Sequence, residues 1–407
     1  MRTPSTALVL LTGLAATLSG CIEEAPNDDT AAVLVDCSSR PLTLPSARGE
    51  VGGAWDAVNG RLVLFGGDQG VPVNCASQTE FVAETWAFHP DCDNFAPIVA
   101  EGPSARGRGA VAGDATHLYA HGGRFRDGTS GAYTLHDDLW ALDYATDTWT
   151  LLAESGPGKR SNHVMVAARG QLFLYGGNSS TNGASFTPLS DLWSFDLSTK
   201  TWTLLQEDAG PGERLFHSAA ISPDERTLYV YGGGDERAFT GPFFGDLWAL
   251  DLDSMTWTEL SDGKESDAPA ARIWAGLHGL DGQVLLWAGH DDGSLGNTNE
   301  LWTFDLGAGA WTSVTMGDTL NSGANGFCDF PADFVTPDLT APERRNAMVS
   351  ALDGDGQLWT FGGKTDCGII NDVWSLELGS LAWTSRSKAT TGEICQRAFA
   401  ECETLCY

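Results

Sequence analysis

The chain has 407 residues, and its 23 lysine and arginine residues face 54 aspartate and glutamate residues, which leaves a net charge of −31. A chain this acidic repels phosphate backbones, so a nucleic-acid partner is not expected. The 49 glycines and 15 tryptophans indicate a folded protein with an aromatic core and exclude a disordered chain.

The first segment, residues 1–20, has the features of an export signal. Arg2 precedes an apolar stretch, Ala7–Leu18, that is too short to cross a bilayer, because a spanning helix needs roughly 20 residues. The stretch ends in Leu-Ser-Gly-Cys21, which resembles the lipobox of bacterial lipoproteins. The resemblance implies a lipid on Cys21 that anchors the protein in the bacterial cell envelope, at the outer membrane or the cell surface. Cleavage near Ala16, with Cys21 left as a plain thiol, is the alternative.

Residues 21–44 are expected to form the lipidated cysteine and an acidic, flexible lead-in. Eight further cysteines follow Cys21, and an even number in an exported chain indicates up to four disulfides. They are Cys37, Cys75, Cys92, Cys328, Cys367, Cys395, Cys402 and Cys406. None of them forms a Cys-x-x-Cys pair, so zinc and redox sites are weakly supported.

A phrase of an acidic residue, one further residue and tryptophan recurs along the chain. It begins at Asp138, Asp191, Asp246, Glu300 and Asp372, with a degraded copy at Glu84. Nine residues after each of these tryptophans stands another aromatic residue: Phe95, Trp149, Trp202, Trp257, Trp311 and Trp383. A glycine pair precedes each phrase, with Ala288-Gly289 as a variant. An arginine lies further upstream, at Arg48, Arg106, Arg160, Arg214, Arg272 and Arg344.

Each unit of about 54 residues predicts four short strands, because short apolar and β-branched runs alternate with turn residues. The glycine pair and the two aromatic residues at fixed spacing resemble the kelch repeat. The resemblance covers residues 45–386 and implies an all-β fold, a six-bladed β-propeller with four antiparallel strands in each blade. A residue that recurs six times in one context is expected to be structural, so we expect the six arginines to tie adjacent blades together.

All six units are complete, so no strand is expected to be exchanged across the junction of the first and last blades. The cysteine-rich tail, residues 387–407, is expected to be pinned at this junction by disulfides. A disulfide between Cys328 and Cys367 is also predicted, because both lie in loops of one face. A Cys75–Cys92 pair is not expected, since these residues are placed at opposite ends of one strand.

The candidate binding site lies in the loops between the second and third strands. The separation from glycine pair to tryptophan falls from 19 residues in the first unit to 11 in the last, which favours a shaped groove over a plain scaffold. Basic and aromatic side chains of the second, fourth and fifth of these loops are candidates for an anionic ligand, with aromatic rings as stacking platforms. They are Arg124, Arg126, Tyr133, Arg237, Phe239, Phe243, Phe244 and His290. The alternative is that these arginines pair with local aspartates and the phenylalanines pack under their own loops.

No cofactor or metal is expected, because His117 and His121 would lie ~13 Å apart on one strand, too far to share an ion. Two functions stay open. The first is a monomeric binding module that attaches to the membrane through its lipid and recognises a protein or an anionic glycan. The second is a carbohydrate-active enzyme of the sialate mutarotase type, a class that the kelch resemblance includes. A copper radical oxidase is disfavoured, because only Tyr133 among the candidate tyrosines lies in a loop of the ligand face.

Overall fold

The computed structural model divides into two compact units, Met1–Asp36 and Cys37–Tyr407. The structure describes Cys37 and residues 43–70, 79–128, 130–183, 185–237, 241–291, 296–321, 335–336, 338, 340–365 and 368–389. The secondary-structure elements in these ranges are β-strands. The described residues include no helix that is long and apolar enough to cross a membrane. The predicted Cys328–Cys367 disulfide and the tail beyond residue 389 lie outside the described residues.

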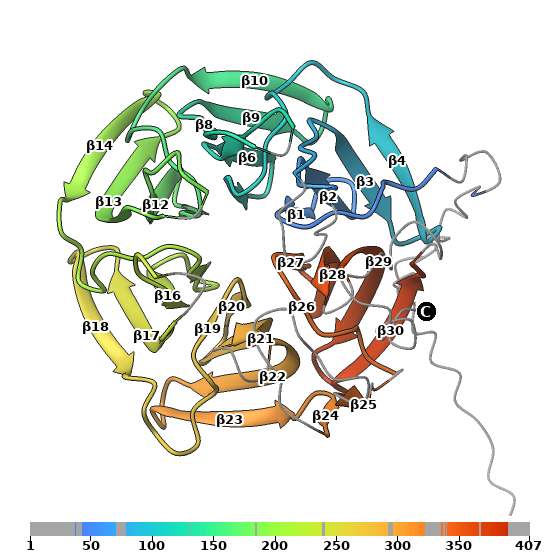
Figure 1. Ribbon diagram of the computed structural model, residues 1–407, viewed down its shortest axis with the longest axis vertical. Coiled ribbons are helices and arrows are strands. Elements are labelled where there is room, and N and C mark those ends of the chain that lie inside the picture. Colours follow the sequence, from blue (N-terminus) through green and yellow to red (C-terminus); the bar gives the residue numbers. More distant parts are fainter. Residues whose placement is uncertain are drawn as a thin grey trace, which may run out of the picture. The chain divides into compact units, whose positions relative to one another are not determined.

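The second unit is a ring of six antiparallel blades around a central axis (Figure 1). Blade 1 contains β1 (Gly52–Asp56), β2 (Arg61–Phe65), β3 (Thr85–His89) and β4 (Asn94–Ile98). Blade 2 contains β5 (Ala110–Gly113), β6 (His117–His121), β9 (Leu139–Asp143) and β10 (Thr148–Ala153). Blade 3 contains β11 (Val164–Ala168), β12 (Gln171–Asn178), β13 (Pro188–Asp196) and β14 (Thr201–Gln206).

The other three blades repeat the plan. Blade 4 contains β15 (Ser218–Ile221), β16 (Thr227–Gly233), β17 (Phe244–Asp251) and β18 (Thr256–Ser261). Blade 5 contains β20 (Gly276–Leu280), β21 (Gln283–Asp291), β22 (Asn297–Asp305) and β23 (Ala310–Thr315), with the short β19 (Arg272–Ile273) beside β21. Blade 6 contains β27 (Val349–Leu352), β28 (Gln357–Thr365), β29 (Gly368–Glu377) and β30 (Ala382–Ser387), with β26 (Arg345–Asn346) beside β28. The predicted six-bladed, four-stranded architecture is therefore confirmed.

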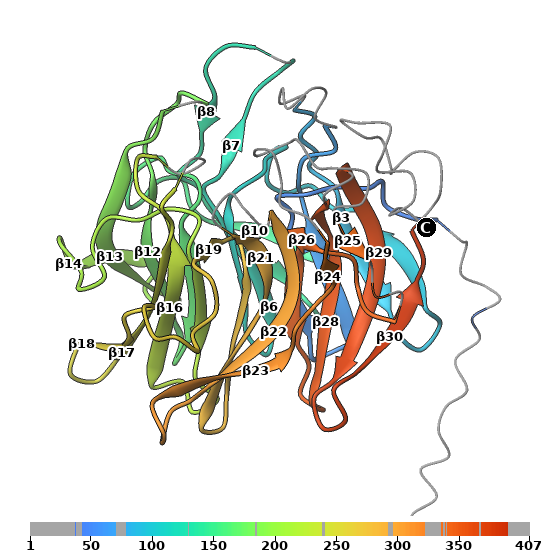
Figure 2. The same ribbon diagram turned by 60° about the horizontal axis from the view of Figure 1, so that its bottom comes forward.

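Two small hairpins interrupt this plan. The pair β7 (Arg124–Phe125) and β8 (Thr134–Leu135) belongs to the loop between the second and third strands of blade 2, and Figure 2 shows it projecting beyond the blades at one end of the ring. The pair β24 (Thr319–Leu320) and β25 (Val335–Thr336) precedes blade 6.

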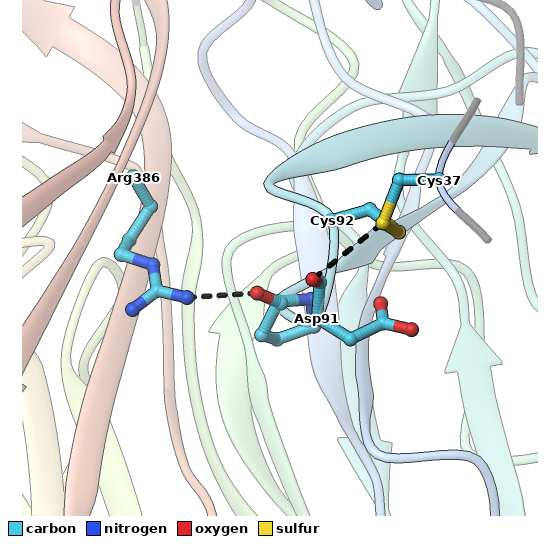
Figure 3. Close-up of a disulfide and its surroundings, with 5 residues drawn as sticks. Cys37, Asp91, Cys92 and Arg386 are labelled. Carbon is cyan, nitrogen blue, oxygen red and sulfur yellow. Dashed lines mark hydrogen bonds between the residues drawn. A yellow bond between two sulfur atoms is a disulfide. The ribbon is translucent and has the colours of Figure 1, made fainter. Parts of the chain in front are cut away.

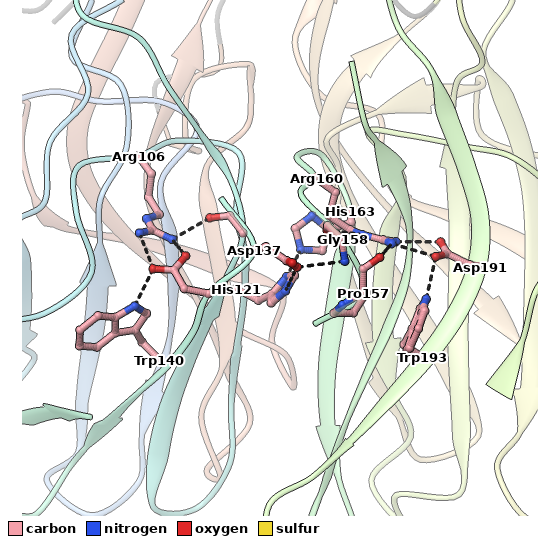
Figure 4. Close-up of polar contacts among 12 residues, drawn as sticks. Arg106, His121, Asp137, Trp140, Pro157, Gly158, Arg160, His163, Asp191 and Trp193 are labelled. Atoms are coloured by element: carbon pink, nitrogen blue, oxygen red, sulfur yellow. Dashed lines mark hydrogen bonds and ion pairs between the residues drawn. The ribbon is translucent and has the colours of Figure 1, made fainter. Parts of the chain in front are cut away.

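A buried arginine holds each blade together from within. In blade 2, Arg106 donates to both carboxylate oxygens of Asp138 (2.6 and 3.0 Å) and to the carbonyl oxygen of Gly122 (3.0 Å). The indole N–H of Trp140 donates to the same carboxylate at 2.8 Å. Figure 4 shows this clamp in blades 2 and 3. The other clamps are Arg48–Glu84–Trp86, Arg160–Asp191–Trp193, Arg214–Asp246–Trp248, Arg272–Glu300–Trp302 and Arg345–Asp372–Trp374.

The structure confirms that the arginines are structural and corrects two details. The clamp residue of blade 6 is Arg345, not Arg344, because Arg345 lies three residues after Pro342 and donates to Gly362 and Asp372. The side chains also tie their own blades, whereas we expected them to join neighbours. It is the main-chain carbonyl of the clamp arginine that bridges blades, as in Gly67 N to Arg106 O (3.0 Å).

The fourth strands supply the other bridges between blades. The ring of Trp149 on β10 packs on Phe65 of blade 1, and its N–H donates to Thr85 at 3.1 Å. In the same way Trp311 of blade 5 packs on Tyr231 of blade 4. Each such aromatic residue therefore buries its apolar area between two sheets, which neither sheet can achieve alone.

The innermost link is a closed circle of main-chain hydrogen bonds around the axis. Its members stand two residues after each clamp arginine, and we call them the axial ring: Glu50, Arg108, Asn162, Phe216, Trp274 and Ala347. Each donates its N–H to the carbonyl oxygen of the member in the preceding blade, over 2.8–3.4 Å, and Glu50 donates to Ala347 at 2.9 Å to complete the circle. All six have φ between 50° and 61°, a left-handed conformation that side chains disfavour.

The junction of blades 1 and 6 follows the same plan, and no strand is exchanged across it, as predicted. Phe95 of β4 packs on Phe361 of β28, with ring centroids 5.6 Å apart. A disulfide that the sequence did not predict joins Cys37 to Cys92, with the Cα atoms 5.5 Å apart. Beside it, Arg386 of β30 donates to the carbonyl oxygen of Pro90 at 2.8 Å (Figure 3). The side chain of Arg386 thus links blade 6 to blade 1, where it also pairs with Asp93 at 2.7 Å, and the disulfide fixes the lead-in to blade 1 beside this contact.

Ala347→Gly should stabilise the protein, because glycine adopts positive φ without the cost of about 1–2 kcal/mol that an alanine pays. The greater freedom of glycine in the unfolded chain offsets part of this gain, which leaves an expected increase of about 0.5 kcal/mol in the free energy of unfolding. Chemical denaturation measures it. The control is Ala382→Gly, in the strand β30, which should destabilise. A loss of stability in the Ala347 variant would contradict a strained axial ring.

Candidate functional site: the mouth of the central channel

The central channel encloses about 240 Å³ and is lined by the axial ring and the inner strands of all six blades. The axial ring forms one end of this channel, which we call the mouth. The fold demands a left-handed main chain at these six positions but no particular side chain, as the mixture of acidic, basic, amide, aromatic and methyl groups shows. Side chains at the mouth are therefore free to serve binding.

A single carboxylate, that of Glu50, organises the charges at the mouth. Its side chain is 1% exposed and accepts from Lys364 (2.6 Å), while Arg108 lies at 2.7 Å and Arg124 at 3.3 Å. Burial alone would raise the pKa of Glu50. The positive charges of Arg108, Lys364 and Arg124 outweigh that effect and hold its pKa well below the ordinary value. Glu50 is therefore an anion throughout the physiological range.

Arg108 joins the charged side of the mouth to an aromatic side. Its guanidinium lies 5.2 Å from the ring centroid of Phe216 in blade 4 and 5.0 Å from that of Trp274 in blade 5. Such contacts add cation–π attraction of about 0.5–2 kcal/mol each. Because Arg108 comes from blade 2 and touches Glu50 of blade 1, its side chain connects residues from both sides of the ring.

The hairpin of blade 2 extends this cationic group outward. Arg124 and Arg126 lie over the ring of Tyr133, at 4.1 and 4.4 Å from its centroid. Arg126 donates to Thr79 Oγ1 at 3.1 Å, and no carboxylate of the described residues lies within 4 Å of its guanidinium. The predicted candidates Arg124, Arg126 and Tyr133 are thus brought together. Arg124 is buried, whereas Arg126 is partly open to solvent.

The other predicted candidates lie elsewhere. Exposed Arg237 pairs with Asp235 at 2.6 Å, and Phe244 lies under the clamp guanidinium of Arg214. Phe243 is buried in a cluster with Phe216, and this member of the axial ring connects it to the mouth. His290 is buried and its Nδ1 lies 3.2 Å from Asn297 Oδ1. Phe239 lies outside the described residues.

Sequence reasoning missed Glu50 and Arg108 and did not select Lys364. The signal available for the first two is their place two residues after the clamp arginine, where the repeat fixes the main chain but not the side chain. Lys364 directly follows the glycine pair of blade 6. Its stem needs Gly49, because a Cβ atom there would come within 2.7 Å of Lys364 Cγ. Only the closure of the ring brings these residues together.

Below the mouth, imidazoles fill the contacts between blades. His121 Nδ1 lies 2.9 Å from His163 Nε2, and Asp137 lies 3.6 Å from His121 Nε2 (Figure 4). Burial lowers the pKa of His121, and burial lowers those of His163 and His217 well below the ordinary value. These side chains are therefore neutral in the folded protein at neutral pH.

The geometry offers no evident metal centre within the described ranges. No three Cys, His, Asp or Glu side chains gather there in a group that could hold an ion. His117 faces Asp143 at 3.8 Å, whereas His121 faces His163, so the two imidazoles have different partners.

The buried histidines predict a loss of stability in acid. The unfolded chain binds protons at these imidazoles below pH about 6.5, whereas the folded protein resists protonation because their pKa values are lowered, so stability falls as pH drops. Each such histidine contributes a slope of up to about 1.4 kcal/mol per pH unit. His217→Gln should make the fall in unfolding free energy between pH 7.5 and 5 shallower. Equal slopes in the wild type and in the His217 variant would contradict the account.

Comparison with known proteins agrees with this geometry. The family model described as the KLHDC2/KLHL20/DRC7 Kelch-repeats domain matches residues 29–210 and 204–328. The Kelch domain-containing protein 10 of Rattus norvegicus is 26% identical over 69% of this chain and 65% of its own length, and that of Homo sapiens over 69% and 60%. The Leucine-zipper-like transcriptional regulator 1 homolog of Drosophila melanogaster is 23% identical over 64% of this chain and 31% of its own length.

The chain spans less than two thirds of the length of each of these relatives, so the similarity concerns the propeller. The matched residues include the first five of the six clamp arginines, and all six blades follow one plan. Together, the family match and the repeated clamp show that the chain belongs to the kelch-repeat family.

Proposed function

We propose that this protein is a lipid-anchored binding module of the bacterial cell envelope that holds an anionic protein or glycan ligand at the mouth of its channel. The kelch fold, a type of protein-binding module, supports the binding role. The Leu-Ser-Gly-Cys21 motif after a short apolar segment supports the anchor. In this arrangement the acidic lead-in separates the propeller from the membrane surface.

The observation that carries the proposal is the local excess of positive charge at the mouth. The four cations Arg108, Arg124, Arg126 and Lys364 outnumber the two carboxylates that interact with members of this group, Glu50 and Asp68, in a chain of net charge −31. A concave site of one sign focuses ligands of the other. The six clamp arginines cannot compete for such a ligand, because each is buried and paired inside its blade.

Two of the four cations can contact a ligand directly. Arg126 is partly open to solvent and has no carboxylate partner within the described ranges, and the side chain of Lys364 is 25% exposed. Arginine binds a carboxylate through two parallel hydrogen bonds and lysine through a point charge. The buried Arg108 and Arg124 strengthen the field behind them. A carboxylate-bearing ligand is therefore expected to dock on Arg126 and Lys364.

Arg126→Ala combined with Lys364→Ala should weaken binding more than tenfold, because each lost charge-assisted hydrogen bond costs about 1.5–3 kcal/mol. The probes are arrays of acidic peptides and of uronate- and sialate-containing glycans, followed by titration of any ligand that binds. Arg237→Ala is the matched control, since it removes an exposed arginine that is paired with Asp235. Undiminished binding by the double variant, with a normal melting curve, would refute the site.

Cys21→Ala should release the protein from the membrane fraction, because the lipid on Cys21 is the proposed anchor. Fractionation of cells and incorporation of labelled fatty acid measure this. A variant that still sediments with membranes and still takes up the label would contradict the anchor.

A further inference from the structure

We infer that Glu50 is a built-in occupant of a carboxylate-binding site, and that it sets the affinity of the mouth by competing with the carboxylate of the ligand. The inference rests on the proposed function and names its affinity-determining residue. The carboxylate of Glu50 lies where that of a ligand would be best held, within 3.3 Å of three different cations from blades 2 and 6.

The fold does not require a carboxylate at this position. The other five members of the axial ring make the same main-chain hydrogen bonds with arginine, asparagine, phenylalanine, tryptophan or alanine. The role of the Glu50 side chain is therefore to neutralise positive charge of the cations around it. Without it, the three cations would lose the one carboxylate that contacts all of them, and removing one partner of a buried charge pair is costly.

The cations have other contacts that would keep them in place without Glu50. Arg108 lies against Phe216 and Trp274, and Arg124 lies 4.1 Å from the ring centroid of Tyr133. The stem of Lys364 packs beside Gly49. The site should therefore survive the loss of the Glu50 carboxylate as a preformed anion site, because its walls do not depend on that group.

Lys364 is the point of competition. Its ammonium is bound to Glu50 at 2.6 Å and is also the most exposed of the three cations that contact this carboxylate. An incoming carboxylate must share Lys364 with Glu50. With a neutral residue at position 50, the ligand would no longer share the Lys364 ammonium with Glu50. The net charge of the site would also be more positive by one unit.

The size of the site suggests a specific probe. Glu50→Ala deletes four heavy atoms, Cγ, Cδ and the two carboxylate oxygens, and acetate has the same four-atom composition. Acetate should therefore fill the vacated space and restore the lost charge balance. Chloride at the same ionic strength should screen the cations without filling the site.

The experiment titrates acetate against the full chain in detergent micelles, with chloride keeping the ionic strength constant, and follows the melting temperature. Glu50→Ala should melt lower than wild type and should recover saturably with acetate, with an affinity at least tenfold above that of wild type. Adding Lys364→Ala should abolish this recovery. The control is Asp262→Ala, which removes a carboxylate from the exposed Lys264 and so leaves no enclosed space for acetate. It should show no saturable recovery.

If Glu50→Ala does not fold, Glu50→Gln keeps the shape of the side chain and should raise the affinity for glucuronate at least tenfold over wild type. Equal affinities of wild type and Glu50 variants for these anions, lost in both on Lys364→Ala, would overturn the role of Glu50 and leave the anion site intact. No anion binding by either protein would overturn the proposed function as well. A rise in the melting temperature of Asp262→Ala with acetate to the same degree would show a general salt effect and overturn the inference.

Discussion

The closed circle of hydrogen bonds in the axial ring is the constraint on which the rest of the structure depends. Six main chains must turn toward the axis at the same height, and each must adopt a left-handed conformation to donate to the previous blade. The clamp arginine two residues earlier fixes that turn by binding its own blade. Because main-chain hydrogen bonds alone close the axial ring, the side chains at these positions are not needed for closure. They can therefore form a binding site at the axis.

The distribution of charge follows from the same separation between the residues that build the blades and the side chains at the mouth. Most of the arginines that build the blades are buried and paired, so they do little for the surface field. The surface is left strongly acidic, and positive charge concentrates where blades 1, 2 and 6 meet around Glu50. In a low-dielectric, concave setting such a cluster attracts anions more effectively than scattered surface charges would. The acidic surface keeps anions away from the remainder of the domain.

The fold could be predicted from the sequence because the same sequence pattern recurs in six units. The glycine pair and the paired aromatic residues each recur for one physical reason, the packing of one sheet on another. The one misplaced clamp, Arg344 for Arg345, arose where two adjacent arginines follow Pro342, and both the three-residue spacing from this proline and the contact with Asp372 identify Arg345. The Cys37–Cys92 disulfide was not predicted, because it depends on where the lead-in crosses blade 1.

The site was only partly predictable for a related reason. Arg124, Arg126 and Tyr133 share one loop, so their proximity follows from local sequence. Glu50 and Lys364 stand at opposite ends of the propeller sequence and become neighbours only when the ring closes. In the sequence, Arg237 of the corresponding loop in blade 4 looked equivalent to Arg124 and Arg126, yet it is held by the nearby Asp235. Which cation is free for a ligand is decided by such local pairing, which composition does not reveal.

The most direct test of the account is a crystal structure of the protein with D-glucuronate, a small anion that carries one carboxylate. The account predicts density for the carboxylate at the mouth, within hydrogen-bonding distance of Lys364 Nζ or the Arg126 guanidinium. Glucuronate bound at another surface, with the mouth holding only water, would contradict the claim that this cationic cluster is the binding site.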